Sequence, residues 1–103
     1  MGKTVVHGRF EWDADKDEAN KKKHGISFEE ILPMFDDPLF LEGIDLEHST
    51  EEEIRFIGIA QISGFVIVVS IYTERERTRI ISARIATKKE ERRYEERYKD
   101  FYA

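Results

Sequence analysis

The sequence predicts an α+β fold, in which a small antiparallel β-sheet is flanked by two N-terminal helices and a C-terminal helix. Two runs rich in β-branched and aromatic residues, 54–62 and 65–72, are separated only by Ser63 and Gly64, a pattern typical of a β-hairpin. Helix-start signals come before and after these runs. Helices followed by grouped strands favour α+β over an alternating α/β arrangement.

The N-terminal part predicts a short strand and then a helix. Residues 5–12 contain Val, Phe and Trp, which favour a strand. Asp13 is a good N-cap for a helix over residues 14–24, and Gly25 is a good stop. This helix is mostly polar with Ala19 as its main apolar residue, so we expect a surface helix that buries Ala19.

A second helix is expected to begin at Ser27. Ser27 and Glu30 form a capping-box pattern, in which each side chain can bond the other residue's backbone N–H. Pro33 removes an internal hydrogen bond, so the helix should be short or kinked there. Four apolar side chains follow at helical spacing: Phe28, Ile31, Leu32 and Phe35.

The remaining elements follow from the same signals. Residues 39–41 predict a brief strand and residues 43–53 an acidic loop. Residues 78–86 predict a third strand after the hairpin. Thr87 and Glu90 form a second capping box, which predicts the start of the final helix.

A two-residue turn at Ser63 and Gly64 would fix the register of the hairpin. Arg55 would then face Tyr72, and both would share one side of the sheet with Ser82 and Arg84. By strict alternation Arg79 would lie on the opposite side. The other side of the second hairpin strand would be the core: Phe65, Ile67, Val69 and Ile71.

Composition limits the class of protein. A chain of 103 residues predicts one domain, 1–103. Without cysteine there is no disulfide, thiolate metal site or cysteine nucleophile, which fits a reducing compartment. The longest apolar run, 65–69, is too short to cross a bilayer, and the N-terminus lacks a signal-peptide pattern. We therefore expect a cytoplasmic protein without membrane contact.

Charge is polarised along the chain, although the formal net charge is -5. Residues 36–53 contain eight acids and no Lys or Arg, whereas residues 75–99 contain ten basic residues against five acids. Around the last strand lie Arg75, Arg77, Arg79 and Arg84. Guanidinium groups bind phosphate with paired hydrogen bonds, so these arginines favour a phosphate-bearing partner. The alternative is a solvated surface on which they pair with nearby glutamates.

Two side chains are candidates for proton transfer. His24 is a candidate because histidine is the residue type most suited to acid-base work, but at a helix end it can equally serve to interact with the helix dipole. Tyr72 can exchange a proton or stack on a base, but a tyrosine at a strand end more often packs at the edge of the core. His48 is expected to be a loop residue, and with His7 it makes no metal-ligand spacing. We expect no metal and no cofactor.

The chain resembles the BrnT family of bacterial toxins over about residues 10–96. The resemblance rests on ordered blocks at family-like spacing: Phe10-Glu11-Trp12-Asp13, Asn20, Lys23 to Glu30, Phe35 to Pro38, His48-Ser49, Glu53 to Gly58, Val69, Tyr72 to Arg75, Arg79 to Arg84, and Ala86-Thr87. It implies a RelE-like fold and a type II toxin that cleaves RNA and inhibits translation. It also implies a ribbon-helix-helix antitoxin, BrnA, as partner, with a toxin homodimer inside a heterotetramer.

The resemblance also implies a set of site residues. The catalytic candidates are His24, Tyr72, Arg79 and Arg84, and the substrate-binding candidates are Lys23, Arg55 and Arg75. Two alternatives stay open. The chain could be a non-catalytic protein-binding module, or a degenerate toxin retained for its antitoxin complex and for regulation of the shared operon.

Overall fold

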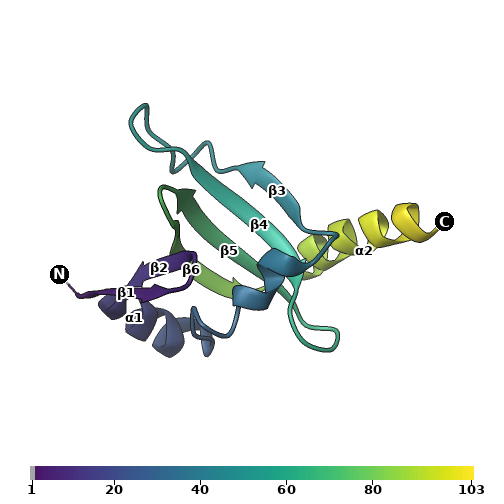
Figure 1. Cartoon of the computed structure of the whole chain (residues 1–103). Coiled ribbons are helices and arrows are strands. Elements are labelled where there is room, and N and C mark those ends of the chain that lie inside the picture. Colours follow the sequence, from purple (N-terminus) through teal and green to yellow (C-terminus); the bar gives the residue numbers. More distant parts are fainter. Residues whose placement is uncertain (1) are drawn as a thin grey trace.

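Six strands form one mixed sheet in a computed structural model that describes residues 2–103 (Figure 1). The elements are β1 (Thr4–His7), β2 (Phe10–Asp13), α1 (Ala14–His24), the 3-10 helix η1 (Leu32–Asp36), β3 (Leu41–Ile44), β4 (Arg55–Gln61), β5 (Ile67–Glu74), β6 (Thr78–Ile85) and α2 (Lys88–Tyr102). The strand order is β1-β2-β6-β5-β4-β3, and β2 runs parallel to β6. The α+β class is confirmed, but the sheet is mixed rather than purely antiparallel.

The first helix, α1, forms as predicted. The Asp13 side chain accepts the backbone N–H groups of Asp15 and Lys16, and Gly25 adopts the left-handed conformation at φ 71° that ends the helix. The residue that α1 buries is not Ala19, which is exposed, but Asn20. The Asn20 amide donates to the Ala83 carbonyl at 2.8 Å. Because β2 pairs with β6 only as far as Ile80, Asn20 takes over the free edge of β6 beyond that point.

A second N-terminal α-helix does not form, so that prediction is wrong. The capping box itself is present, since the Ser27 N–H donates to Glu30 Oε1 at 3.0 Å and the Glu30 N–H to Ser27 Oγ at 3.1 Å. The chain then makes turns and the short helix η1, with Pro33 in its first turn. Pro33 cannot donate the backbone bond that α-helical propagation needs. The apolar side chains of this segment are nevertheless buried, Phe28 and Ile31 completely.

Two strand predictions are also corrected. Residues 5–12 form a hairpin, β1 and β2, rather than one strand, because Gly8 turns the chain at a positive φ of 59°. The brief strand expected at 39–41 begins later, as β3, and reaches Ile44. It pairs with β4 and forms one edge of the sheet.

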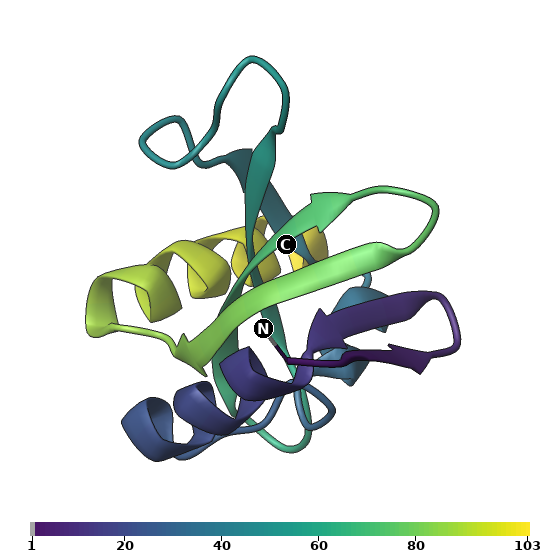
Figure 2. The ribbon, with the colours of Figure 1, turned by 90° about the vertical axis from the view of Figure 1, so that its left-hand side faces the viewer.

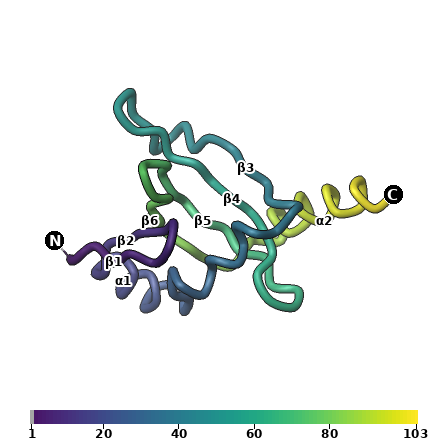
Figure 3. Tube along the Cα trace, viewed as in Figure 1, coloured from purple at the N-terminus to yellow at the C-terminus, as the bar shows by residue number. Residues whose placement is uncertain are grey.

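Helices lie on both sides of the sheet (Figure 2), and buried side chains form a cluster on each face. One face packs against α1 and the η1 segment, and its buried residues include Trp12, Phe28 and Tyr72. The other face packs against α2 through Ile59, Val69 and Tyr94. The two termini lie at opposite ends of the molecule (Figure 3). Within residues 2–103, no helix has the length and apolar character needed to cross a membrane.

Candidate functional site

The β4–β5 connection is longer than predicted, which changes the register of the hairpin. Pairing stops at Gln61 and Ile67, leaving five residues, 62–66, in the loop. Arg55 therefore faces Thr73 and not Tyr72. A shift of one residue moves every side chain of a strand to the other face. Phe65, predicted in the core, lies instead in the loop with 95% of its side chain surface exposed.

Tyr72 consequently points away from Arg55, into the core beside α1. It is 1% exposed and packs against the rings of Phe35, Phe40 and Phe56. Its hydroxyl donates to the Glu42 carboxylate. Burial, followed by this carboxylate, raises the pKa of Tyr72 well above its ordinary value. The predicted grouping of Tyr72 with Arg55, Ser82 and Arg84 on one face is therefore wrong.

Tyr72 is removed from the face that carries Arg55, whereas a β-bulge in β6 brings Arg79 onto that face. Ile71 faces Ser82, but Tyr72 faces Ile80, so Ile81 is an extra residue. Beyond the bulge Arg79 faces Thr73, which itself faces Arg55. The placement of Arg79 on the opposite side is thus also wrong, because strict alternation does not hold across a bulge. We call the face that carries Arg55, Arg79 and Arg84 the arginine face.

An open cavity of about 400 Å³ lies on this face, beyond the part that α2 covers. It brings together two of the predicted arginines and residues of the β3–β4 loop. Its lining consists of Asp45, Glu47, His48, Arg55, Ile57, Val69, Ile71, Ile81, Ser82 and Arg84. Sequence reasoning placed His48 only in a loop. The strands predicted on both sides of this loop could have located His48. If they pair as a hairpin, the loop ends beside Arg55, the first residue of β4.

Every arginine of the arginine face has a carboxylate partner in the chain. Arg84 binds Glu90 through two bonds, Nη1–Oε1 at 2.7 Å and Nη2–Oε2 at 2.9 Å. Arg79 pairs with Glu11, its neighbour on β2. The hydrogen bond from Arg84, together with its charge and the bonds from Thr87, lowers the pKa of Glu90 to about 2. The pairing that we weighed as the alternative to phosphate binding is therefore present.

Glu53 joins two further arginines. Its carboxylate lies 2.7 Å from Arg75 Nη2 and 3.6 Å from Arg55 Nε. The bond from Arg75 is the largest cause that lowers the pKa of Glu53. Arg75 comes from the β5–β6 turn, is about half exposed and does not line the cavity. It is the outer member of this cluster.

Lys23 and His24 lie elsewhere, at the C-terminal end of α1. Lys23 is exposed and His24 is half-buried, and neither lines the cavity on the arginine face. The structure therefore does not group them with Arg55 and Arg84. In the part of the chain from residue 2 onward, no cluster of three or more His, Asp or Glu side chains could hold a metal ion.

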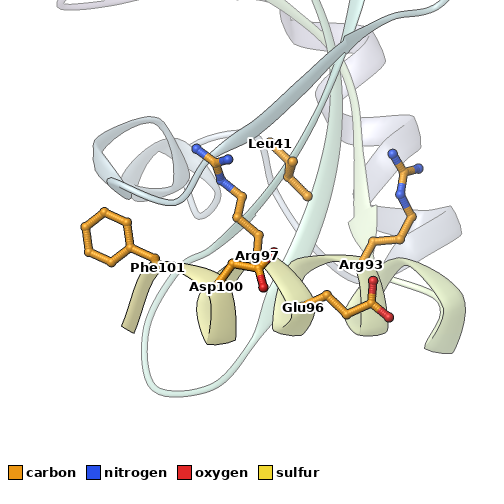
Figure 4. A pocket seen from close by; sticks show the side chains of 6 residues that line it. All are labelled: Leu41, Arg93, Glu96, Arg97, Asp100 and Phe101. Atoms are coloured by element: carbon orange, nitrogen blue, oxygen red, sulfur yellow. The ribbon is translucent and has the colours of Figure 1, made fainter. Parts of the chain in front are cut away.

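A second cavity, of about 450 Å³, lies between α2 and the sheet edge (Figure 4). Arg93 and Arg97 reach from α2 toward the strands there, with Glu96 and Asp100 on the same helix. Arg97 Nε already donates to the Leu39 carbonyl at 3.1 Å. The residues that line this cavity include no group that titrates near neutral pH, so its chemistry is poorer than that of the arginine face.

Comparison with known proteins identifies the family of this chain. The sequence model of a family described as "Ribonuclease toxin, BrnT, of type II toxin-antitoxin system" matches residues 12–90. The chain belongs to the BrnT family. The ribonuclease toxin BrnT of Brucella abortus, solved at 1.1 Å, is similar in structure, with a TM-score of 0.55 and 26% identity over 75% of this chain and 94% of that one. Among curated proteins, no sequence matches.

Membership of the BrnT family supports two coarse statements. The chain is a member of a family of ribonuclease toxins, and a type II toxin works together with an antitoxin. The matched residues 12–90 include Arg55, Arg79, Arg84 and Glu90. The arginine face therefore lies wholly within the part of the chain that defines the family.

Proposed function

We propose that this chain is a RelE-like endoribonuclease that cleaves RNA without a metal ion and so inhibits translation. The observation that carries the proposal is the arginine face, where Arg55 and Arg84 line an open cavity and Arg79 lies on the same face of the sheet, in a chain of the BrnT family. RNA is a polyanion, and guanidinium groups on a concave surface offer it charge and paired hydrogen bonds.

The chemistry needs positive charge where negative charge develops. In metal-free cleavage the 2′-oxygen attacks the adjacent phosphorus, and the pentacoordinate phosphorane carries more charge on its oxygens than the starting diester. The arginines would stabilise that charge. A guanidinium group that binds a carboxylate through two parallel N–H bonds can exchange it for a phosphate, which accepts the same pair of bonds. Arg84 already presents its guanidinium in this two-bond arrangement to Glu90.

Of the two proton-transfer candidates from the sequence, we do not carry Tyr72 into the mechanism. Its hydroxyl lies on the opposite face of the sheet and is bonded to Glu42. Its raised pKa also makes it a poor base at neutral pH. His24 stays a candidate to be tested by substitution, although it does not line the cavity.

The partner that we propose is a BrnA-like ribbon-helix-helix antitoxin, which masks the toxin in a heterotetramer that contains two toxin chains. Type II toxins are controlled in this way so that the RNA of the host is protected until the antitoxin is lost. The proposed place of action is the cytoplasm, where messenger RNA is translated.

One observation favours a second function. Glu11, Glu53 and Glu90 neutralise the arginines, and the chain has a formal net charge of -5. Positive potential drives most non-specific binding of nucleic acid, so this pairing lowers the attraction for RNA. A degenerate toxin, retained only as a non-catalytic protein that binds its antitoxin, would show the same pairing.

Inducible expression, with and without the neighbouring gene, tests these functions. We expect the wild-type chain alone to arrest growth and degrade RNA, and Arg55→Ala/Arg84→Ala to abolish both while keeping the wild-type circular dichroism spectrum. Lys88→Ala/Arg92→Ala removes the same charge from the exposed surface of α2 and should leave the arrest intact. A folded Arg55/Arg84 variant that stays fully toxic would contradict the site.

The same strains separate the remaining alternatives. A wild-type chain that neither arrests growth nor cleaves RNA, but still copurifies with the neighbouring gene product, would support the degenerate toxin. Cleavage of purified RNA in the presence of EDTA is expected for the metal-free mechanism. His24→Ala in the same assay shows whether that side chain takes part.

A further inference from the structure

We infer that His48, held by Asp45, is the base that removes the proton from the RNA 2′-hydroxyl; this inference rests on the proposed function. His48 lines the cavity of the arginine face together with Arg55 and Arg84. Neither His48 nor Asp45 was singled out by the sequence as a site residue. They stand out only because the β3–β4 loop returns beside β4.

The two side chains form an oriented pair. His48 Nδ1 lies 2.9 Å from Asp45 Oδ2. The Asp45 side chain is 14% exposed, whereas that of His48 is 58% exposed. A largely buried carboxylate that accepts Nδ1–H fixes the tautomer in which Nε2 carries the lone pair. Because the His48 side chain is exposed, this ring can reach a hydroxyl of a polymer that is too large to enter a closed pocket.

The loop that carries this pair is tied to the backbone of Arg55. The Asp45 N–H donates to the Arg55 carbonyl at 2.8 Å. Ser49 Oγ accepts the Arg55 N–H at 2.8 Å and donates to the Asp45 carbonyl at 2.7 Å. These bonds fix the position of His48 relative to the first arginine of the arginine face. A base held at a constant distance from the phosphate-binding groups is what in-line attack requires.

His48 Nε2 accepts the 2′-hydroxyl proton while the 2′-oxygen forms its bond to phosphorus, and the bond from phosphorus to the 5′-oxygen breaks. Water protonates the departing 5′-oxygen, and His48 later returns its proton to solvent. The products are a 2′,3′-cyclic phosphate and a 5′-hydroxyl. Asp45 is a positioning residue, because it acts only through His48, and the other charged groups that line the cavity are Glu47, Arg55 and Arg84.

The test uses the purified full chain and a labelled single-stranded oligoribonucleotide. His48→Ala should slow single-turnover cleavage by about 10²- to 10⁴-fold, the usual contribution of a general base. Binding to the same oligonucleotide with 2′-O-methyl groups, which cannot be cleaved, should stay within about twofold of wild type, since the phosphate-binding arginines are unchanged. Added imidazole should restore part of the rate to His48→Ala, because the site is open to solvent. His7→Ala, an equally exposed histidine outside the cavity, is the matched control and should cleave normally.

Asp45→Asn gives the second measurement. It keeps the shape of the side chain but cannot stabilise the protonated imidazole, so we expect a slower rate, unchanged binding and no rescue by imidazole. If wild type cleaves and folded His48→Ala cleaves equally fast, or if imidazole restores nothing, the assignment of His48 is wrong and the proposed function still stands. If wild type itself does not cleave, both proposals fail together.

Discussion

Thr73 and Ser70 are buried hydroxyl residues on opposite faces of the same strand, and they differ in hydrogen bonding. Ser70 Oγ donates to the Ser82 carbonyl at 2.9 Å, whereas Thr73 Oγ1 is buried without a hydrogen-bond partner among residues 2–103. A buried polar group without a partner lowers stability by about 1–3 kcal/mol relative to a paired one. Thr73→Val should therefore leave the free energy of unfolding unchanged or raise it by about 1 kcal/mol, while Ser70→Ala lowers it by about 1–2 kcal/mol.

Urea unfolding of both variants measures the difference. The two positions share strand and burial, so Ser70→Ala is the control for Thr73→Val. If Thr73→Val is as destabilising as Ser70→Ala, the Thr73 hydroxyl must have a hydrogen-bond partner in solution. Water would then reach this buried position on the arginine face.

Asn20 is the other residue whose role depends on backbone bonding. Its side chain binds both the N–H and the C=O of Ala83 and also the Ile26 carbonyl. Asn20→Ala leaves three buried backbone groups without a partner, and we expect a loss of about 3 kcal/mol, or a fall in Tm of more than about 10 °C for a domain of this size. Glu18→Ala, on the exposed side of α1, should change Tm by only a degree or two. A small effect of Asn20→Ala in a thermal melt would mean that water replaces the amide at the edge of β6.

At the scale of elements, α2 starts with a capping box whose Glu90 also binds Arg84 of the arginine face. Glu90 accepts the Thr87 N–H at 2.8 Å and binds Arg84 at the same time. The ionised carboxylate is favoured in the folded state, where its pKa is about 2 against an ordinary 4.5. A depressed pKa contributes stability above the unfolded value, and that stability is lost as the pH falls through the folded value.

Glu90→Gln should therefore lower the free energy of unfolding by about 1–2 kcal/mol at pH 7, after allowance for screening by solvent. The difference from wild type should shrink between about pH 4.5 and pH 2, where Glu90 takes up its proton. Glu91→Gln, in the same turn of α2, is the control and should show no such trend. A difference that is constant over this pH range would show that Glu90 acts through packing rather than charge.

The elements also show where sequence patterns succeed. The two helices with a good N-cap and no proline behaved as predicted, α1 in both bounds and α2 in its start after Thr87, because capping is a local property. Ser27 has a capping box too, but Pro33 prevents an α-helix after it. The register of β4 and β5 was wrong by one residue because the loop between them is longer than predicted. The bulge at Ile81 in β6 was missed because strict alternation of side chains does not reveal it.

At the scale of the whole molecule, the sequence predicted the grouping of two arginines on one face better than it predicted the residues around them. Arg55 and Arg84 were placed on one face correctly, because two errors of one residue in successive registers affected Tyr72 but not this pair. The carboxylates that neutralise them could not be foreseen, since Glu11 and Arg79 are far apart in sequence and meet only through the parallel pairing of β2 with β6. The order of strands in the sheet determines which of these charged residues meet, and the number of charges in the sequence does not reveal it.

The dependence of RNA binding on salt concentration tests whether RNA contacts the arginine face directly, because the chain as a whole is acidic. If Arg55, Arg79 and Arg84 contact phosphates, binding of a 2′-O-methyl oligoribonucleotide should weaken with salt, with a slope in log–log form of about -2 for three contacts to a single strand. Arg84→Ala should reduce the magnitude of that slope by about 0.7, since one phosphate contact is lost. Arg92→Ala removes an equal charge from the exposed surface of α2 and should leave the slope unchanged. Fluorescence anisotropy across a salt series measures all three proteins. Equal slopes for Arg84→Ala and Arg92→Ala would mean that RNA responds to the overall field of this acidic chain rather than to the arginine face.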